Sequence, residues 1–506
     1  MKKIIYSALI FCGLAFSGCE DFLTVQSPDK LDSSTFWRDA ADARAALATV
    51  YAQLEYIGSG WDVAEVKFPV EAYREDLVEL GVDASNYSDW VDLFKFTTTS
   101  GNSQLTYYWR APYYGICYAN QVIEKTPTIP AGRIEEGERG ATITEAHFLR
   151  GFYHMKLLMN WERIIIRDKY ITSQNELSKE LAPRDVAWDF IIQDLKIGTG
   201  LIDKRPALEL GRATKGAAYA YLGWAYLTRA YEEPSRKQEF LTAAIDAFDK
   251  VTGYELDSDF IGMFNTSNKN GKESIFEMQF LDHPTTWQTS TISKWLQSSE
   301  LRGYDEIIPH ANLLKEYKKE GKLAQFEDGT PAYDLRTYAT LFFQDEYFND
   351  PVAKRVYGKT FDRTFKNNPA TRVVFRKYLP ADGLKLYDDW QATNIVMMRY
   401  ANVLLLKAEA FNELGQTDKA IPLINEIRKV HGGMPPMAGS DYAAVKAQIE
   451  HERILEFPLE NSRFFDLRRW NKTKEAIEAV GRTFIPASHN FYPIPQLEVN
   501  GNESLN

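Results

Sequence analysis

Two stretches of the sequence share a pattern of small and large apolar residues that strongly limits how the chain can fold. One stretch pairs residues 212–231 with 240–251, and the other pairs 399–414 with 419–430. The first segment of each pair carries small residues at helical spacing: Ala218, Gly223 and Ala225 in one, and Ala401, Ala408 and Ala410 in the other. Small residues let two helices approach closely, and a shared apolar stripe favours their stacking. The pattern therefore predicts two helical hairpins.

Hairpins of this kind resemble tetratricopeptide repeats, which are normally about 34 residues long. Generic helix packing is the alternative, since repeats this degenerate are weak signals alone. Helical periodicity predicts further hairpins at 37–56 with 101–125 and at 140–161 with 185–197, and a C-terminal helical region at 441–480. We therefore predict a mainly α fold, a superhelix of tetratricopeptide-like hairpins.

Two inserts interrupt the helical pattern, at residues 57–100 and 253–395. They are rich in turn-forming residues, and the longer one contains β-prone pieces at 274–280 and 372–378. The inserts also hold several tryptophans: Trp61, Trp90, Trp287, Trp295 and Trp390. Because function lies more often on loops than on the scaffold that carries them, we predict that the inserts form an irregular, ligand-binding half.

The N-terminus has the pattern of an export signal. A basic start precedes an apolar run over residues 4–16, which is too short for a stable membrane-spanning helix, and Cys19 follows a Ser-Gly pair. A short membrane anchor or a buried core helix is the alternative. The position of Cys19 resembles a bacterial lipoprotein signal, in which the cysteine is fatty-acylated after cleavage. We expect a signal peptide at 1–18, a lipidated tether at 19–36 and one domain at 37–506.

Composition excludes several classes of partner. The formal net charge is −11 and no basic block occurs, which argues against nucleic acid because phosphates need a positive footprint. Three cysteines give neither a disulfide framework nor a metal-ligand cluster, and Cys117 is expected to be a small buried hydrophobe. No cofactor is expected.

Catalytic motifs are also missing from the sequence. Neither a Gly-rich phosphate loop after a strand nor a Gly-x-Ser-x-Gly elbow occurs. His147 and His154 share a helical face near Glu145, but a zinc site needs closer convergence and a third ligand. A C-terminal charge cluster invites a glycosidase hypothesis. Its charges alternate at helical spacing, which favours ion pairs: Glu452, Glu456 and Glu460 beside Arg453, Arg463, Arg468 and Arg469. We expect no enzymatic activity.

Four parts of the chain resemble the SusD/RagB family of outer-membrane nutrient-binding lipoproteins. They are Cys19 with Glu20-Asp21 and Phe22-Leu23; Glu145-Ala146, Leu149-Arg150, Tyr153 and Leu157; Glu452-Arg453, Glu456-Phe457, Glu460 and residues 463–470; and residues 492–495. The C-terminal motif is the most specific. The chain departs from the family where Asn160-Trp161 replaces the usual Phe-Gly pair.

The resemblance implies four tetratricopeptide-like hairpins wrapped by an irregular ligand-binding half. It also implies a location on the outer membrane, facing the cell exterior through a lipid anchor. The implied function is binding of oligosaccharide or polysaccharide and its delivery to a TonB-dependent transporter of the SusC type. A peptide- or protein-binding lipoprotein on the same scaffold is the main alternative, and a surface glycosidase is a third.

Exposed aromatic rings are the expected ligand platform, because the apolar C–H face of a pyranose lies well against an indole while its hydroxyls need polar groups around the rim. Trp287, Trp295 and Tyr304 lie where family members commonly carry such rings. Trp61 and Trp90 are further candidates, and Asp282, Gln288 and Arg302 are candidate rim groups. Ordinary packing is the alternative for every ring, since tryptophan is usually mostly buried. Joint replacement of Trp287 and Trp295 by alanine is expected to abolish retention on a glycan gel.

Overall fold

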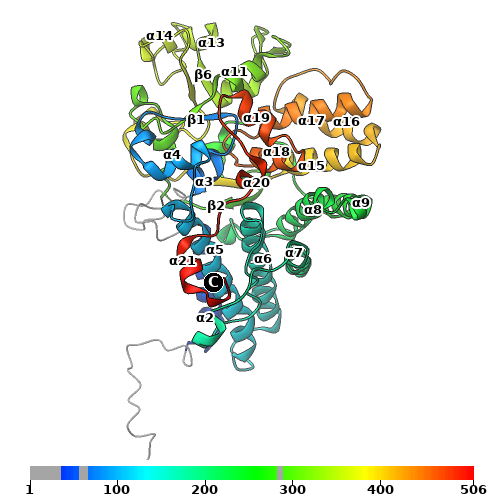
Figure 1. Ribbon diagram of the computed structural model, residues 1–506. Coiled ribbons are helices and arrows are strands. Elements are labelled where there is room, and N and C mark those ends of the chain that lie inside the picture. Colours follow the sequence, from blue (N-terminus) through cyan, green and yellow to red (C-terminus); the bar gives the residue numbers. More distant parts are fainter. Residues whose placement is uncertain (1–35, 56–66, 282–288, 506) are drawn as a thin grey trace, which may run out of the picture.

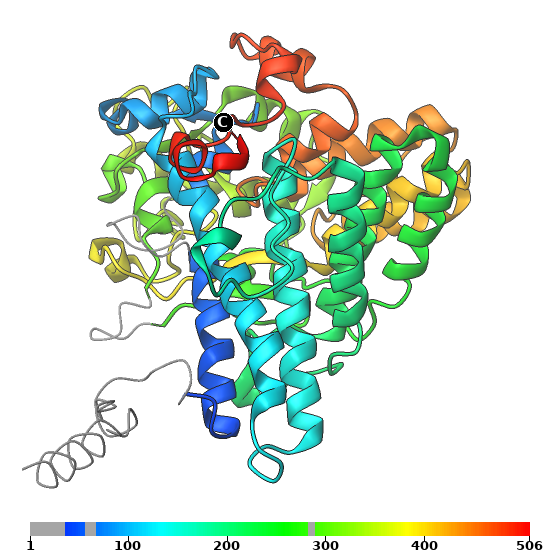
Figure 2. The same ribbon diagram turned by 60° about the horizontal axis from the view of Figure 1, so that its bottom comes forward.

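The computed structural model describes residues 36–55, 67–281 and 289–505, which form a helical half and a loop-rich half (Figure 1). Four antiparallel helix pairs make up the helical half, and Figure 2 shows them side by side in sequence order, from blue to orange. The pairs are α2 (Ala40–Ala52) with α5 (Ser103–Lys125), α6 (Glu136–Asn160) with α7 (Arg184–Gly198), α8 (Lys215–Glu232) with α9 (Lys237–Phe248), and α15 (Tyr400–Glu413) with α16 (Thr417–Val430). The predicted mainly α, tetratricopeptide-like fold is confirmed.

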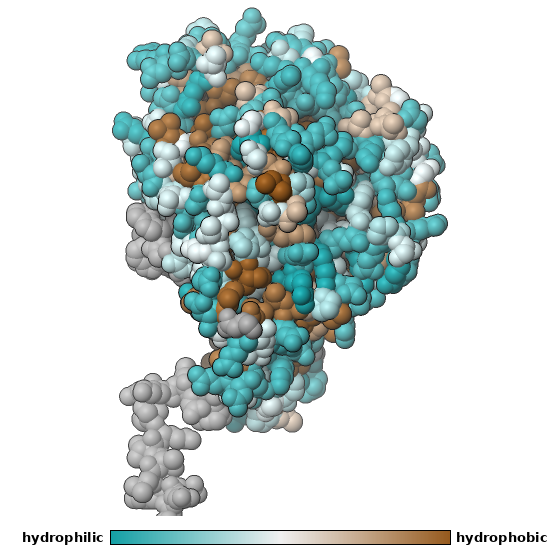
Figure 3. Space-filling model, in the orientation of Figure 1, coloured by the Kyte–Doolittle hydropathy of each residue, from teal (hydrophilic) through white to brown (hydrophobic). Residues whose placement is uncertain are grey.

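The C-terminal region adds shorter helices to this array. They are α17 (Tyr442–Glu456), which packs on α15 and α16, and then α18 (Arg463–Arg469), α19 (Thr473–Ala479), α20 (Pro486–His489) and α21 (Gln496–Gly501). None of the helices in the described part of the chain is both long and apolar enough to span a bilayer. Most of the surface in Figure 3 is hydrophilic, and its hydrophobic side chains gather in a few small patches, one of them over α5 and α21.

Side-chain caps fix the starts of several helices. Asn102 accepts hydrogen bonds from the backbone of Gln104 at 3.0 Å and Leu105 at 3.3 Å, and Asp441 caps α17 in the same way. Such a cap stabilises a helix by about 1 kcal/mol. Cys117 on α5 is half-buried, where the sequence analysis expected a small buried hydrophobe.

Glycines lie where neighbouring helices touch, both within a pair and between pairs. A Cβ atom on Gly223 of α8 would overlap the Phe248 ring of α9, and one on Gly151 of α6 would come 2.9 Å from the Cβ of Asp194 on α7. Gly115 of α5 meets the Tyr153 ring of α6 in the same way. These glycines, of which Gly223 was predicted from the sequence, therefore set the spacing of the helices.

Replacement of Gly223 by leucine is expected to lower the free energy of unfolding by about 1–3 kcal/mol, because the added side chain must displace Phe248 in a closely packed contact. Urea denaturation measures the change. Gly140→Ala in α6 is the matched control: its Cβ meets nothing within 4 Å, so better helix propensity should raise stability by about 0.5–1 kcal/mol. Equal stability of the two variants would contradict the assigned packing.

Within the described residues, the strands form two-stranded antiparallel sheets, and the β1–β3 and β2–β8 sheets join distant parts of the chain. The pairs are β1 (Val78–Leu80) with β3 (Ile307–Pro309), β2 (Ser274–Met278) with β8 (Ile395–Arg399), β4 (Ala324–Gln325) with β5 (Pro331–Ala332), and β6 (Leu341–Phe343) with β7 (Val373–Phe375). The β-prone pieces predicted at 274–280 and 372–378 contain β2 and β7. Since β8 runs directly into α15, the β2–β8 pair attaches the longer insert to the helix pairs.

Short helices complete the loop-rich half, which lies at the top of Figure 1. They are α3 (Lys67–Ala72), α4 (Ser88–Lys95), α10 (Ile292–Leu296), α11 (Ala311–Lys318), α12 (Leu335–Thr340), α13 (Glu346–Asn349) and α14 (Phe361–Thr364). The β1–β3 pair joins the two inserts and thereby brings α4 and α10 together.

Candidate functional site

Five of the residues predicted from the sequence lie outside the described part of the chain. They are the lipidation residue Cys19 and the candidate ligand contacts Trp61, Asp282, Trp287 and Gln288. The roles of these five residues stay predictions. Trp90, Trp295, Arg302 and Tyr304 can be placed, and all four lie where α4, α10 and the turn after α10 meet.

Trp90 of α4 and Trp295 of α10 pack against each other, with ring centroids 4.7 Å apart. Both side chains are only 7% exposed, so the expectation of exposed rings does not hold for this pair. All of α10 is buried, which explains why its tryptophan cannot face the solvent. Tyr87, at the start of α4, packs on Trp90 at 4.6 Å and is 50% exposed. Replacement of Trp295 would open a cavity and is no clean test of binding.

A buried lysine holds the surrounding loops in place. The Lys294 ammonium donates hydrogen bonds to the carbonyl oxygens of Arg302 and Leu386, each at 2.9 Å, and lies 3.4 Å from the Asp389 carboxylate. The backbones of Ser290 and Gln391 pair nearby. These contacts fix the segment 385–391 beside α10 and the turn that carries Tyr304.

An exposed group of aromatic and charged side chains results, which we call the aromatic patch: Tyr87, Arg302, Tyr304, Tyr387 and Asp389. Tyr304 is 37% and Tyr387 is 63% exposed. The Arg302 guanidinium lies over the Tyr387 ring at 5.1 Å. Partial burial and the neighbouring Asp389 carboxylate, to which the hydroxyl donates, raise the pKa of Tyr304. The patch thus offers ring faces next to a cation and an anion.

Glu306 lies beside this patch, and its backbone amide donates to the carbonyl of Trp295 at 2.9 Å. The side chain is 5% exposed, and Oε2 has no hydrogen-bond partner among the described residues. Burial, together with the nearby Asp83 carboxylate, raises the pKa of Glu306 to about 8. The raised pKa favours the neutral acid, which can donate a hydrogen bond, over the carboxylate.

Comparison with known proteins identifies the family. One family model, described as the SusD family, matches residues 272–506, and a second, described as starch-binding and associating with the outer membrane, matches residues 21–227. The chain belongs to the SusD/RagB family. The resemblance found in the sequence is confirmed.

Similar proteins span nearly the whole of this SusD/RagB chain. SusD-like protein P2 of Formosa agariphila is 24% identical across 100% of the chain and 99% of its own length. The crystal structure of a SusD superfamily protein from Bacteroides vulgatus superposes with a TM-score of 0.78 at 25% identity, covering 92% of this chain and 98% of that one. Surface glycan-binding protein A from Bacteroides thetaiotaomicron, in complex with laminarihexaose, gives a TM-score of 0.73 at 19% identity over 92% and 98% of the two chains, a likeness of fold.

Sequence reasoning found part of the patch of this SusD/RagB chain. Arg302 and Tyr304 are exposed as expected, but Tyr87, Tyr387 and Asp389 were missed. The signal for the latter two was the string Tyr387-Asp388-Asp389-Trp390, which puts aromatic and acidic side chains together in a loop. Trp390 is itself 36% exposed.

The C-terminal charge cluster of the SusD/RagB motif consists of buried ion pairs, as expected. Arg336 contacts Glu452 and Glu456, each at 2.7 Å, and Arg399 contacts Glu460 at 2.8 Å. The arginines of the motif are paired too: Arg453 with Asp466, Arg463 with Asp76, and Arg469 with Glu409 and Asp466, while Arg468 donates to backbone carbonyls. With their oxygens engaged by arginines, the carboxylates hold the fold together.

One buried group has the geometry of a metal site, namely Glu273, His431 and Glu456. His431 Nδ1 lies 2.7 Å from Glu456 and Nε2 lies 3.0 Å from Glu273. Although burial opposes its charge, the two carboxylates raise the pKa of His431 to about 9. Arg399 binds both carboxylates as well. The carboxylate oxygens that would bind a metal ion are already paired with the protonated His431 imidazole and the Arg399 guanidinium. A protonated imidazole has no free nitrogen lone pair for a metal, so these residues do not fit a metal ion.

The side chains of α6 considered for a zinc site, Glu145, His147 and His154, do not converge on one point. Glu145 pairs with Arg205 at 2.7 Å and with Arg212 at 2.6 Å. His154 is buried, which lowers its pKa to about 4, and its two ring nitrogens bond to the backbone of Arg150 and Arg167. His147 faces Asp194 instead.

Proposed function

We propose that this chain binds oligosaccharide or polysaccharide at the aromatic patch and does not cleave it. The observation that carries the proposal is the set of exposed rings, Tyr87, Tyr304 and Tyr387, beside Arg302 and Asp389. The match to a family model described as starch-binding and the laminarihexaose complex of a protein with the same fold support it.

The chemistry of the patch suits sugars. Pyranose C–H faces pack on tyrosine rings, while Arg302 donates to ring hydroxyls and Asp389 accepts from them. Each ring contributes about 0.5–1.5 kcal/mol beyond its buried area. Two or three rings therefore give a dissociation constant of about 1 mM to 1 μM, weak enough for the ligand to be passed on.

We infer the location and the partner from what the resemblance to the family implies. Fatty-acylated Cys19 anchors the mature chain in the outer membrane, facing the cell exterior, and the tether 19–36 links the anchor to the folded body. The bound glycan is handed to a SusC-like TonB-dependent transporter. The family model that matches residues 21–227 carries the description of outer-membrane association, which supports this placement.

Joint replacement of Tyr304 and Tyr387 by alanine is expected to weaken glycan binding about 10- to 100-fold, because two ring contacts worth about 1–3 kcal/mol are lost. Affinity electrophoresis in gels that contain a neutral glucan (laminarin or starch) or an acidic polysaccharide (a polyuronate or a sulfated glycan) identifies a glycan that retains the unchanged protein, and calorimetry on that glycan measures the loss. Tyr304→Phe with Tyr387→Phe keeps the rings and should retain most of the affinity.

The matched control places the same change elsewhere: Tyr114→Ala with Tyr442→Ala removes two similarly exposed tyrosines, 42% and 43% exposed, from the helical half. This control should migrate like the unchanged protein. Unaltered retention of the Tyr304/Tyr387 alanine variant would refute the patch as the site. Binding of peptides but of no polysaccharide would instead favour the peptide-binding alternative.

A further inference from the structure

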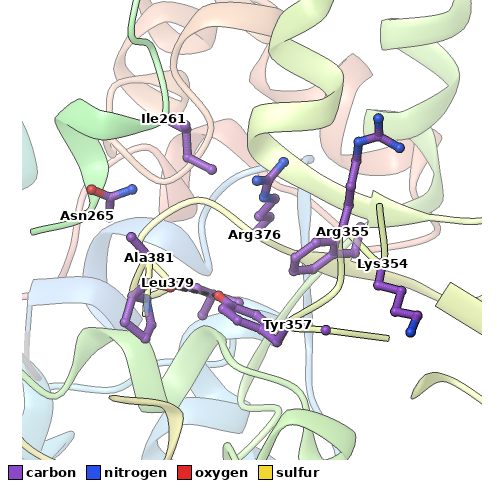
Figure 4. A pocket seen from close by; sticks show the side chains of 11 residues that line it. Ile261, Asn265, Lys354, Arg355, Tyr357, Arg376, Leu379 and Ala381 are labelled. Carbon is purple, nitrogen blue, oxygen red and sulfur yellow. Dashed lines mark hydrogen bonds between the residues drawn. The ribbon is translucent and has the colours of Figure 1, made fainter. Parts of the chain in front are cut away.

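A pocket of about 360 Å³ opens in the loop-rich half (Figure 4), and no residue of the aromatic patch lines it. Its walls come from four segments: residues 261–265, Phe342 of β6, the turn 354–358 and residues 376–381 after β7. The volume lies in the range of small-molecule sites, about 300–1,000 Å³.

The charged side chains that line the pocket are all cationic. Lys354, Arg355 and Arg376 belong to the lining, and no acidic residue does. Arg355 pairs with Asp350 at 3.0 Å, whereas Lys354 and Arg376 form no ion pair with any described residue. In a chain of net charge −11, this is a local concentration of positive charge.

Arg376 is fixed in place. Its Nη1 donates to the carbonyl of Tyr338 at 2.6 Å, and the guanidinium lies over the Phe342 ring at 5.3 Å. Burial lowers the pKa of Arg376, and its electrostatic neighbours are tyrosines. A guanidinium held this way has donors left over and no carboxylate to satisfy them, so an anionic ligand would be favoured.

The other polar groups point to the same ligand class. Asn265 Oδ1 accepts from the amide and hydroxyl of Ser267 at 2.8 and 2.6 Å, and Figure 4 shows the amide nitrogen on the side toward Arg376. The Tyr357 hydroxyl donates a hydrogen bond to the carbonyl oxygen of Pro380 at 2.8 Å. This bond engages one of the hydrogen-bond acceptors in the pocket wall. Donors therefore dominate, and the Tyr357 ring and Leu379 supply an apolar face.

The pocket and the aromatic patch share one segment of chain. Residues 379–381 line the pocket, and the 3-10 helix Gly383–Tyr387 follows and ends on a tyrosine of the patch. A Cβ atom on Gly383 would lie 3.1 Å from the Tyr357 ring, so this helix packs directly on the pocket wall. Tyr357 itself has φ of 50°, a costly conformation for a bulky residue that is more frequent at binding sites.

We propose that this pocket binds the carboxylate or sulfate group of an acidic sugar, and that the glycan taken up by this protein is therefore anionic. The second statement rests on the function proposed above, whereas the first stands on the pocket alone. Arg376 and Lys354 pair with the anion, Asn265 donates to it, and the sugar ring lies against Tyr357 and Leu379.

The probes are glucuronic acid, glucose 6-sulfate and neutral glucose, titrated into the whole mature chain and followed by ligand-observed NMR. At least one acidic sugar should bind at millimolar concentration and weaken as salt is raised, while glucose should not bind. Tighter binding of glucuronic acid would indicate a uronate site, and tighter binding of glucose 6-sulfate would indicate a sulfate site. Lys354 is exposed, so it can be changed without disturbing the core. Lys354→Glu should weaken acidic-sugar binding at least tenfold. Arg376→Gln should abolish it.

Lys366→Glu is the matched control, because Lys366 is exposed, lies outside the lining and changes the net charge equally; it should bind like the unchanged protein. The Tyr304/Tyr387 alanine variant should still bind the acidic monosaccharide, which separates failure of the patch from failure of the pocket. Absence of acidic-sugar binding by the unchanged chain, or unaltered binding by Lys354→Glu, would overturn the proposal.

Discussion

Replacement of Arg399 by methionine is expected to lower the free energy of unfolding by about 3–5 kcal/mol. Arg399 is 1% exposed and bonds to three carboxylates, those of Glu273, Glu456 and Glu460. Methionine fills similar space but leaves these buried charges with fewer counter-charges, and the cost of an uncompensated buried charge is large. A lower midpoint of urea denaturation with an unchanged slope measures the effect.

The control removes an arginine from the surface. Arg236 pairs with Glu239, and the two side chains are 46% and 59% exposed. Arg236→Met should therefore change stability by less than about 1 kcal/mol, because solvent screens such pairs. If both methionine variants lose the same stability, burial of the Arg399 cluster is not what makes it important.

The large effect matters because the Arg399 cluster joins the two halves of the molecule. Arg399 ends β8 at the start of α15, and Glu456 ends α17. From the loop-rich half, Arg336 reaches Glu452 and Glu456, and Lys377 reaches Glu460 at 2.7 Å. Since Lys377 neighbours Arg376, the same ion pairs position the wall of the cationic pocket. The C-terminal motif, the most specific of the sequence, thus holds the two halves together through buried ion pairs.

Local pattern was enough to predict the helix pairs. The spacing of Gly223 and its neighbouring small residues could be read because helical contacts repeat every three to four residues. The ion-pair partners could not be predicted in the same way. Glu456 meets Arg336 across 120 positions and Glu273 lies on a third segment, and nothing in the local sequence marks such contacts.

The site was harder to predict for a similar reason. Tryptophan is both a common sugar platform and a common core residue, and only tertiary packing decides between these roles. Trp90 and Trp295 pair in the interior because the β1–β3 pair draws the two inserts together. Tyr87 and Tyr387 stay exposed because each lies at the end of a short element, at the surface of the loop-rich half.

Stability of the folded chain is expected to fall as pH rises from about 6.5 toward 9, and His431 is the cause. The pKa of His431 is raised to about 9 in the folded state, against an ordinary value of 6.5, so the folded state holds this proton more tightly than the unfolded state. The stabilisation is complete below pH 6.5 and is lost as pH passes the folded pKa. A shift of this size corresponds to about 3 kcal/mol.

Other groups titrate in the same range, so the measurement is a difference between two proteins. Burial lowers the pKa of Lys377 to about 8, which makes stability rise with pH, and the raised pKa of Glu306 makes it fall. Both groups remain in His431→Gln, and their contributions largely cancel when its unfolding free energy is subtracted from that of the unchanged protein. The difference should shrink by about 3 kcal/mol between pH 6 and 9.5. A difference that stays constant with pH would mean that His431 is neutral between its two carboxylates, and the cluster would then carry one more uncompensated negative charge than its geometry implies.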